Sequence, residues 1–216
     1  MTPTAGSTMP RPERIMRFSR TERAFHWVHA SAFFAMLATG LVLYLPSLST
    51  WISRRNLVKN IHLITAIAWV VALVAVVVFG NRQALRRFWR EVETIDRDDR
   101  RWLTLRPAPQ GRINAGQKIN TIFTAAFALL FILSGFLLWL GERDHRFLFD
   151  GTGALHDVLT FTSIALIAGH LYLALIHPTT RHAMRGMTTG EVDVEWAARH
   201  HAKWVAKERA TSGGDH

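Results

Sequence analysis

The stretch Leu155–Ile176, LHDVLTFTSIALIAGHLYLALI, constrains the fold more than any other part of the chain. It is apolar and long enough to cross a bilayer as one helix, which takes about 20 residues. It places His156 and His170 fourteen positions apart. In a helix, this spacing puts both rings on one face, about 21 Å apart along the axis. Because a polar ring is costly inside a membrane, two such histidines indicate a functional site.

Three further stretches have a similar length and composition: Trp27–Leu45, Ile61–Gly80 and Ile119–Leu140. None of the four contains Lys, Arg or Glu, and the one acidic residue among them is Asp157. Each is close to the length that spans the hydrocarbon core. The sequence therefore predicts an all-α integral membrane protein, a four-helix transmembrane bundle.

The basic residues are distributed unevenly among the connecting segments. Of the 26 Lys and Arg residues, five precede the first span, ten lie between Gly80 and Ile119, and six follow the fourth span. Short cytoplasmic loops carry the excess of Lys and Arg. Both termini and the central loop are therefore predicted to be cytoplasmic. The net charge of +10 is assigned to contact with anionic membrane lipid or a protein partner, and no nucleic acid is expected.

The chain is predicted to have three parts. Residues 1–22 form a cytoplasmic N-terminal segment, residues 23–180 form the membrane domain with its cytoplasmic loop 81–118, and residues 181–216 form a cytoplasmic amphipathic tail. In the tail, EVDVEWAARHHAKWVAKERA at 191–210 is expected to form one amphipathic helix. Loop 81–118 contains ALRRFWREVETI, whose apolar residues recur at helical spacing and predict an amphipathic helix. The chain contains no cysteine, which excludes disulfides, thiol chemistry and iron–sulfur clusters held by this chain.

Depth along the predicted spans sorts four histidines into two pairs. His26 and His170 lie toward the cytoplasmic side, and His62 and His156 lie toward the outer side. Two facing imidazoles without cysteine suit the axial ligation of haem iron. We therefore expect two bis-histidine b-type haems between the helices. A zinc or copper site is less favoured, because the pairs are about 20 Å apart and neither adds a third ligand.

The other histidines are expected to have lesser roles. His29 lies one turn from His26 and is its weaker competitor as a ligand. His177 would lie at the interface, where it could shuttle protons or contact a haem propionate. The remaining histidines considered, which are predicted to be solvated, are His145, His182, His200 and His201. The small residues that would let a flat macrocycle approach the helices are Gly40, Gly135 and Gly169.

Several motifs together resemble one known family. They are ERAFHW at 22–27, NIHLITAIA at 60–68, INAGQK at 113–118, the pair His156 and His170, and RGMTTGEVDVEWAARHHAKW at 185–204. From about Arg17 to Trp204, the chain resembles the cytochrome b (gamma) subunit of respiratory membrane-bound formate dehydrogenases.

This resemblance implies an electron-transfer subunit in the bacterial inner membrane. A molybdenum- or tungsten-containing (alpha) subunit would oxidise formate, so the formate site lies on another chain. An iron–sulfur (beta) subunit would pass electrons to the outer haem, between His62 and His156. Electrons would then reach the inner haem, between His26 and His170, and reduce a quinone at the cytoplasmic side.

The resemblance also implies a quinone site at Asn114, Gly116 and Gln117. From the residues alone, Asn-Ala-Gly-Gln is an ordinary helix N-cap. Asn and Gln side chains do supply the hydrogen-bond donors that a quinone carbonyl requires, and glycine permits close backbone approach.

Three alternatives remain open from the sequence. The histidines in four helices would equally fit the cytochrome b subunit of a nickel–iron hydrogenase or of another quinone-linked oxidoreductase. A transporter or proton channel with a histidine relay would titrate its histidines and show no visible absorbance. A structural anchor would keep its colour and activity when His62 or His170 is replaced.

Overall fold

The computed structural model describes residues 13–212, and four long helices dominate this part of the chain. They are α1 (Arg20–Tyr44), α3 (Arg55–Phe79), α6 (Ala115–Gly141) and α7 (Thr152–Leu171), the last continuing as one π-helical turn, η2 (Tyr172–Ile176). All four are long and apolar enough to cross a membrane, as the sequence predicts. Each begins before its predicted span, because polar first turns extend the helices beyond the apolar stretch.

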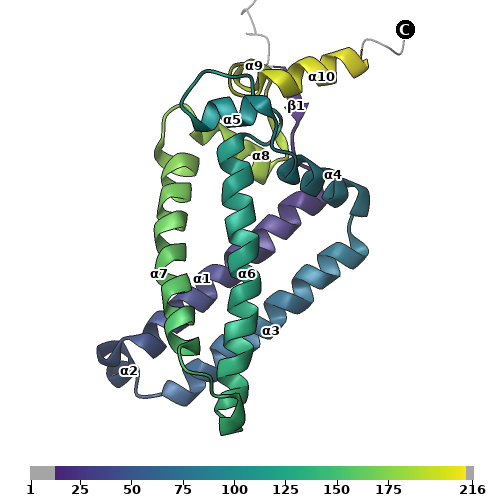
Figure 1. The fold of residues 1–216 in the computed structure, drawn as a ribbon. Coiled ribbons are helices and arrows are strands. Elements are labelled where there is room, and N and C mark those ends of the chain that lie inside the picture. The colour runs from purple at the N-terminus through teal and green to yellow at the C-terminus, as the bar shows by residue number, and fades with distance from the viewer. Residues whose placement is uncertain (1–12, 213–216) are drawn as a thin grey trace, which may run out of the picture.

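The four spans form two antiparallel pairs, which Figure 1 shows crossing one another. Contacts are extensive between α1 and α3 and between α6 and α7, and they are sparse between one pair and the other. Few span residues are buried against other parts of the chain. The two helix pairs therefore contact each other at only a small number of positions.

The outer surface of the spans is apolar and exposed. Ile64, Val71 and Leu129 are each more than 60% exposed, and further large apolar side chains lie around them. A water-soluble monomer rarely shows such a continuous apolar surface. The surface suits the hydrocarbon of a bilayer.

The first and last described elements, β1 (Arg14–Met16) and α10 (Ala202–Ser212), lie at one end of the bundle, which we call the terminal face (top of Figure 1). The other end, the loop face, holds α2 (Pro46–Ile52) and the short η1 turn (His145–Phe147). On the terminal face lie α4 (Arg82–Glu93), α5 (Arg97–Leu103), η3 (Arg181–Ala183), α8 (Met184–Thr188), α9 (Val194–His200) and α10 (Ala202–Ser212). The amphipathic helix predicted in loop 81–118 is confirmed as α4.

The tail is not the single amphipathic helix that the sequence predicts. Its first residues form strand β2 (Glu191–Asp193), which pairs antiparallel with β1 (Arg14–Met16). The helical part is then divided into α9 and α10 at His201, whose backbone is not helical. Pairing with a strand far away in the sequence leaves no signal in the tail itself, which explains the error.

The terminal face has small apolar cores of its own. One joins the tail residues Val192, Trp196, Ala197, Trp204 and Val205. The second joins three distant segments through Phe18, Val92 and Ile113. The N-terminal segment, central loop and tail therefore fold together over one end of the bundle.

Buried charges connect the same segments. Arg112 donates to the Glu22 carboxylate at 2.7 Å, with both side chains 6% exposed, and to the Arg17 carbonyl oxygen. Arg17 donates in turn to the Arg112 carbonyl oxygen and to Gln117 Oε1. Burial, and then the charge of Arg112, lowers the pKa of Arg17 to about 9. Lys118 pairs with Asp99 in a second buried contact.

His201 is buried, which contradicts the prediction that it is solvated. It is 2% exposed, and its Nδ1 lies 2.7 Å from the Gly111 carbonyl oxygen. Burial, and then the charge of Arg17, lowers the pKa of His201 to about 3. His145 and His182 are exposed as predicted, whereas His200 is half-buried and stacks on Trp196.

We expect this burial to make the terminal face sensitive to acid. Between pH 6.5 and 3, the unfolded chain binds a proton at His201 that the folded chain does not, so stability falls as the pH falls. At pH 5 the loss is about 2 kcal/mol, at about 1.4 kcal/mol for each pH unit below 6.5. Thermal unfolding of wild type and His201→Gln at pH 7 and pH 5 measures it. The variant should lose less stability; an equal loss in both proteins would contradict the prediction.

Candidate functional site: two facing histidine pairs

The histidine pair nearer the terminal face joins α1 to α7. The ring centroids of His26 and His170 are 6.3 Å apart, and the rings are tilted by 52°. His29 lies against Trp69 of α3, with 5.5 Å between the ring centroids. Of the two candidates on α1, the structure therefore places His26 opposite His170.

The pair nearer the loop face joins α3 to α7. The ring centroids of His62 and His156 are 6.5 Å apart, and the rings are rotated by 65°. The structure brings together the two pairs that depth along the spans predicts. In both cases the two histidines come from different helix pairs, so they meet where the backbones have few contacts.

These separations fit a metal ion held between two imidazoles. A metal–imidazole bond is about 2.0 Å long, and about 1.2 Å more reaches each ring centroid, so two opposed ligands place their centroids about 6.4 Å apart. Both observed distances are within about 0.2 Å of this value. Within residues 13–212, no three His, Cys, Asp or Glu side chains converge as a metal-binding group. The donor set is therefore two imidazoles per position, which suits the axial ligands of a haem.

Each ring of the loop-face pair is also held by a hydroxyl group. The distance from His62 Nδ1 to Thr39 Oγ1 is 2.8 Å, and that from His156 Nδ1 to Ser134 Oγ is 2.9 Å. Neither hydroxyl was singled out from the sequence. The one available signal is that each directly precedes a glycine, Gly40 or Gly135.

The glycines predicted to let a macrocycle approach differ in their surroundings. A Cβ added to Gly40 would lie 3.6 Å from His62 Cε1, and one added to Gly135 would lie 3.6 Å from His156 Cε1. A Cβ added to Gly169 would meet no atom within 4 Å. Two of the three glycines therefore lie against ligand-candidate rings.

The motif at Asn114, Gly116 and Gln117 forms the start of α6 on the terminal face. Asn114 Oδ1 accepts a bond from Gln117 N, and Gln117 Oε1 accepts from Asn114 N, which is a capping box. Gly116 faces Trp102, whose ring a Cβ would meet at 3.1 Å. The Nδ2 group of Asn114 and the Nε2 group of Gln117 make no hydrogen bond within residues 13–212. The capping box therefore uses neither amide group as a donor.

His177 ends the fourth span, where its Nδ1 lies 3.2 Å from the hydroxyls of Thr179 and Thr180. It packs edge-on against Tyr172. Within the described residues it makes no ring contact with another histidine.

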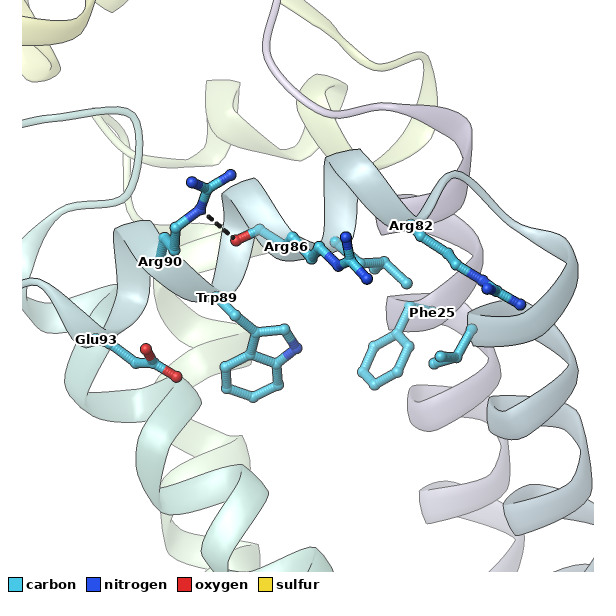
Figure 2. A pocket seen from close by; sticks show the side chains of 8 residues that line it. Phe25, Arg82, Arg86, Trp89, Arg90 and Glu93 are labelled. Atoms are coloured by element: carbon cyan, nitrogen blue, oxygen red, sulfur yellow. Dashed lines mark hydrogen bonds between the residues drawn. The ribbon is translucent and has the colours of Figure 1, made fainter.

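A groove beside α4 contains no histidine. Figure 2 shows Arg82, Arg86 and Arg90 along α4, with the rings of Trp89 and Phe25 pointing down beside the spans. These three arginines form no ion pair with a described residue, whereas Arg87 pairs with Glu91 and Glu208. The groove has a volume of 660 Å³ and is lined by Phe25, Val77, Arg82, Leu85, Arg86, Trp89, Arg90 and Glu93.

Comparisons with known proteins identify relatives along most of the chain. The formate dehydrogenase cytochrome b556(fdo) subunit of Escherichia coli K12 is 28% identical over 222 residues, covering 94% of this chain and 98% of that protein. The formate dehydrogenase cytochrome b556 subunit of Haemophilus influenzae is 25% identical, covering 90% and 84%. The nitrate-inducible cytochrome b556(Fdn) subunit of E. coli K12 is 25% identical, covering 91% and 92%.

A family model described as prokaryotic cytochrome b561 matches residues 17–190. This range includes all four spans, both histidine pairs and the start of α6. The chain is thus a helical membrane protein and belongs to the prokaryotic cytochrome b561 family.

Proposed function

We propose that the chain is the cytochrome b subunit of a formate dehydrogenase and passes electrons from a formate-oxidising partner to a quinone. The observation that carries the proposal is the two histidine pairs, whose separations of 6.3 and 6.5 Å suit bis-imidazole ligation. The relatives named formate dehydrogenase cytochrome b556 subunits support the choice of partner. The partner would supply an iron–sulfur subunit and a molybdenum or tungsten subunit.

His26 and His170 would hold one haem b, and His62 and His156 a second. Haem b, when bound, supplies reversible one-electron transfer at iron. The contribution of the chain is to fix the imidazoles in position and exclude water. Because His156 and His170 share one helix, their spacing of about 21 Å sets the distance between the two positions. The chain would thereby carry electrons between the two faces of the membrane.

We place quinone at the start of α6. The unpaired amide groups of Asn114 and Gln117 would donate to a quinone carbonyl, and Arg17, which already binds Gln117 Oε1, holds the Gln117 amide in orientation. Quinone reduction consumes two electrons and two protons. The terminal face, which we propose to be cytoplasmic, would supply the protons.

The quinone proposal predicts a selective defect in Asn114→Asp and Gln117→Glu. Both changes keep an oxygen that can maintain the capping box, as Asp96 and Asp99 do at the start of α5. Both remove the amide donor and add a negative charge beside the quinone oxygen. Loss of one hydrogen bond is worth about 1 kcal/mol, so we expect the KM for quinone to rise about fivefold. Quinone titration of the formate-dependent activity of the complex measures it.

The controls for these variants are the haem spectrum of the same proteins, which should not change, and their thermal stability, which should not fall, because Arg17 can pair with the carboxylate of Gln117→Glu. Asp98→Asn, in the first turn of α5, where Asp98 pairs with Lys203, serves as a charge change outside α6. An unchanged KM for quinone in both α6 variants would contradict the site.

We further propose that α4 lies on the membrane surface. Its arginines would contact the phosphates of anionic lipid while Trp89 and Phe25 reach the acyl region. We also propose that the chain is divided into three parts: residues 1–22, 23–180 and 181–216. Because β1 pairs with β2, its first and third parts would act as one cytoplasmic unit.

The overall proposal is tested by the reduced minus oxidised absorption spectrum of the purified chain, with haem counted per polypeptide. We expect two b-type haems, and formate should reduce them when the partner subunits are present. Reduction by hydrogen instead of formate would assign the chain to a hydrogenase. Folded, haem-supplied protein without absorbance would contradict the proposal and favour the histidine-relay transporter.

A further inference from the structure

We propose that Thr39 and Ser134 are positioning residues that fix the tautomer and orientation of the loop-face histidines and thereby tune one of the two haem sites. This inference rests on the proposed function, because it concerns histidines that would hold a haem. It goes beyond that function by assigning a role to two hydroxyl groups and by predicting a chemical difference between the two sites.

The direction of each hydrogen bond follows from the other contacts of the hydroxyl. Thr39 Oγ1 lies 2.9 Å from the Ala35 carbonyl oxygen, and Ser134 Oγ lies 2.7 Å from the Leu130 carbonyl oxygen. A carbonyl only accepts, so each hydroxyl gives its single hydrogen to its own helix. Toward the histidine, each hydroxyl then acts as the acceptor, and Nδ1 must carry the proton.

The tautomer matters because a neutral imidazole has one donor nitrogen and one acceptor nitrogen. With the proton on Nδ1, the lone pair is on Nε2, the nitrogen that can ligate a metal. His62 and His156 are therefore both prepared to bind through Nε2. An N–H donated to an oxygen also makes the ring a more basic ligand, which favours ferric iron.

The two contacts follow a common plan. Thr39-Gly40 on α1 presents its hydroxyl to Nδ1 of His62 on α3, with the glycine against Cε1 of the same ring. Ser134-Gly135 on α6 does the same for His156 on α7. Each ring is thus held from within its own helix pair, and its centroid lies 6.5 Å from that of the histidine of the other pair.

The terminal-face pair lacks this arrangement. Among the hydrogen bonds of residues 13–212, none joins the ring of His26 or His170 to a side chain, although their ring separation is similar. The hydroxyl contacts are therefore a property of one site, and their removal should affect one haem.

The test compares variants that remove each hydroxyl with variants that retain it. Thr39→Val and Ser134→Ala remove the acceptor, whereas Thr39→Ser and Ser134→Thr keep it. Thr162→Val is the matched control, because Thr162 also donates to the carbonyl of its own helix, at Val158, but makes no hydrogen bond to a histidine ring within residues 13–212. Spectroscopic redox titration, with electron paramagnetic resonance of the ferric haems, is performed on each purified holoprotein.

In Thr39→Val and Ser134→Ala, we expect one of the two midpoint potentials to move upward and the other to stay unchanged, since a less basic ligand favours ferric iron less. One ferric resonance should shift with it. The affinity for one haem should fall 10- to 100-fold, measured as haem transfer to a scavenging protein. The hydroxyl-retaining variants and Thr162→Val should match the wild type.

The outcomes separate this inference from the proposed function. A wild-type chain without haem would overturn both. A wild-type chain with two haems, whose potentials and resonances are the same in Thr39→Val and Ser134→Ala, would overturn this inference alone. A shift in both haems, or an equal shift in Thr39→Ser, would show a general structural effect and would also overturn it.

Discussion

Replacing His156 by alanine is expected to reduce bound haem from about two per chain to about one. His156 is the α7 partner of His62, and under the proposed function its loss would leave that haem site with a single imidazole. Quinone reduction should fall more than about 100-fold, because losing a direct ligand exceeds the 10- to 100-fold cost of losing a residue that only orients one. Haem content per polypeptide and formate-dependent quinone reduction measure the two effects.

Two control variants make this result specific. His145→Ala changes an exposed histidine on the same face of the bundle and should keep both haems. His29→Ala tests the competitor of His26; because His29 packs on Trp69, this variant should also keep both. Two haems in His156→Ala, or the loss of one in His29→Ala, would contradict the assignment of ligands.

Replacing Arg112 by methionine should lower the free energy of unfolding by about 3–5 kcal/mol. Arg112 pairs with buried Glu22 and with Glu91, each at 2.7 Å. Its removal leaves the Glu22 carboxylate without its cation, whereas Glu91 keeps Arg87. For a domain of this size, the loss corresponds to a melting temperature about 10 °C lower. Circular dichroism of the detergent-solubilised chain measures it.

An exposed ion pair provides the comparison. Arg199 pairs with Glu195 at 2.8 Å, but both side chains are more than 60% exposed, so Arg199→Met should change stability by less than about 1 kcal/mol. Adding Glu22→Leu to Arg112→Met should recover part of the loss, because the isolated charge is then removed. Equal stability of Arg112→Met and Arg199→Met would contradict the structural role of the buried pair.

The spans were predictable because each is a continuous apolar segment. Apolar length is a local property, so Ile61–Gly80 predicts α3 without knowledge of its neighbours. The helix in loop 81–118 was predictable for the same reason, since its apolar residues repeat at helical spacing. The ends of the spans were less accurate, because polar residues continue the helices beyond the apolar stretch.

The pairing of the histidines was also accessible, since a helix converts sequence position into depth. Once the spans alternate in direction, His26 falls at the level of His170, and His62 at the level of His156. Depth alone does not determine how each helix is rotated about its own axis. It was the packing of α1 against α3 that placed His29 on Trp69 and His26 opposite His170.

The sequence by itself determined four membrane helices, a basic set of connecting segments and two levels of paired histidines, because all three depend on local composition and helical rise. Only the tertiary structure decided that β1 pairs with β2, that His201 is buried and that hydroxyls of Thr39 and Ser134 hold the loop-face rings. These features join residues from 22 to more than 170 positions apart along the chain. The partner of such a contact is set by how whole helices pack, and no local pattern records it.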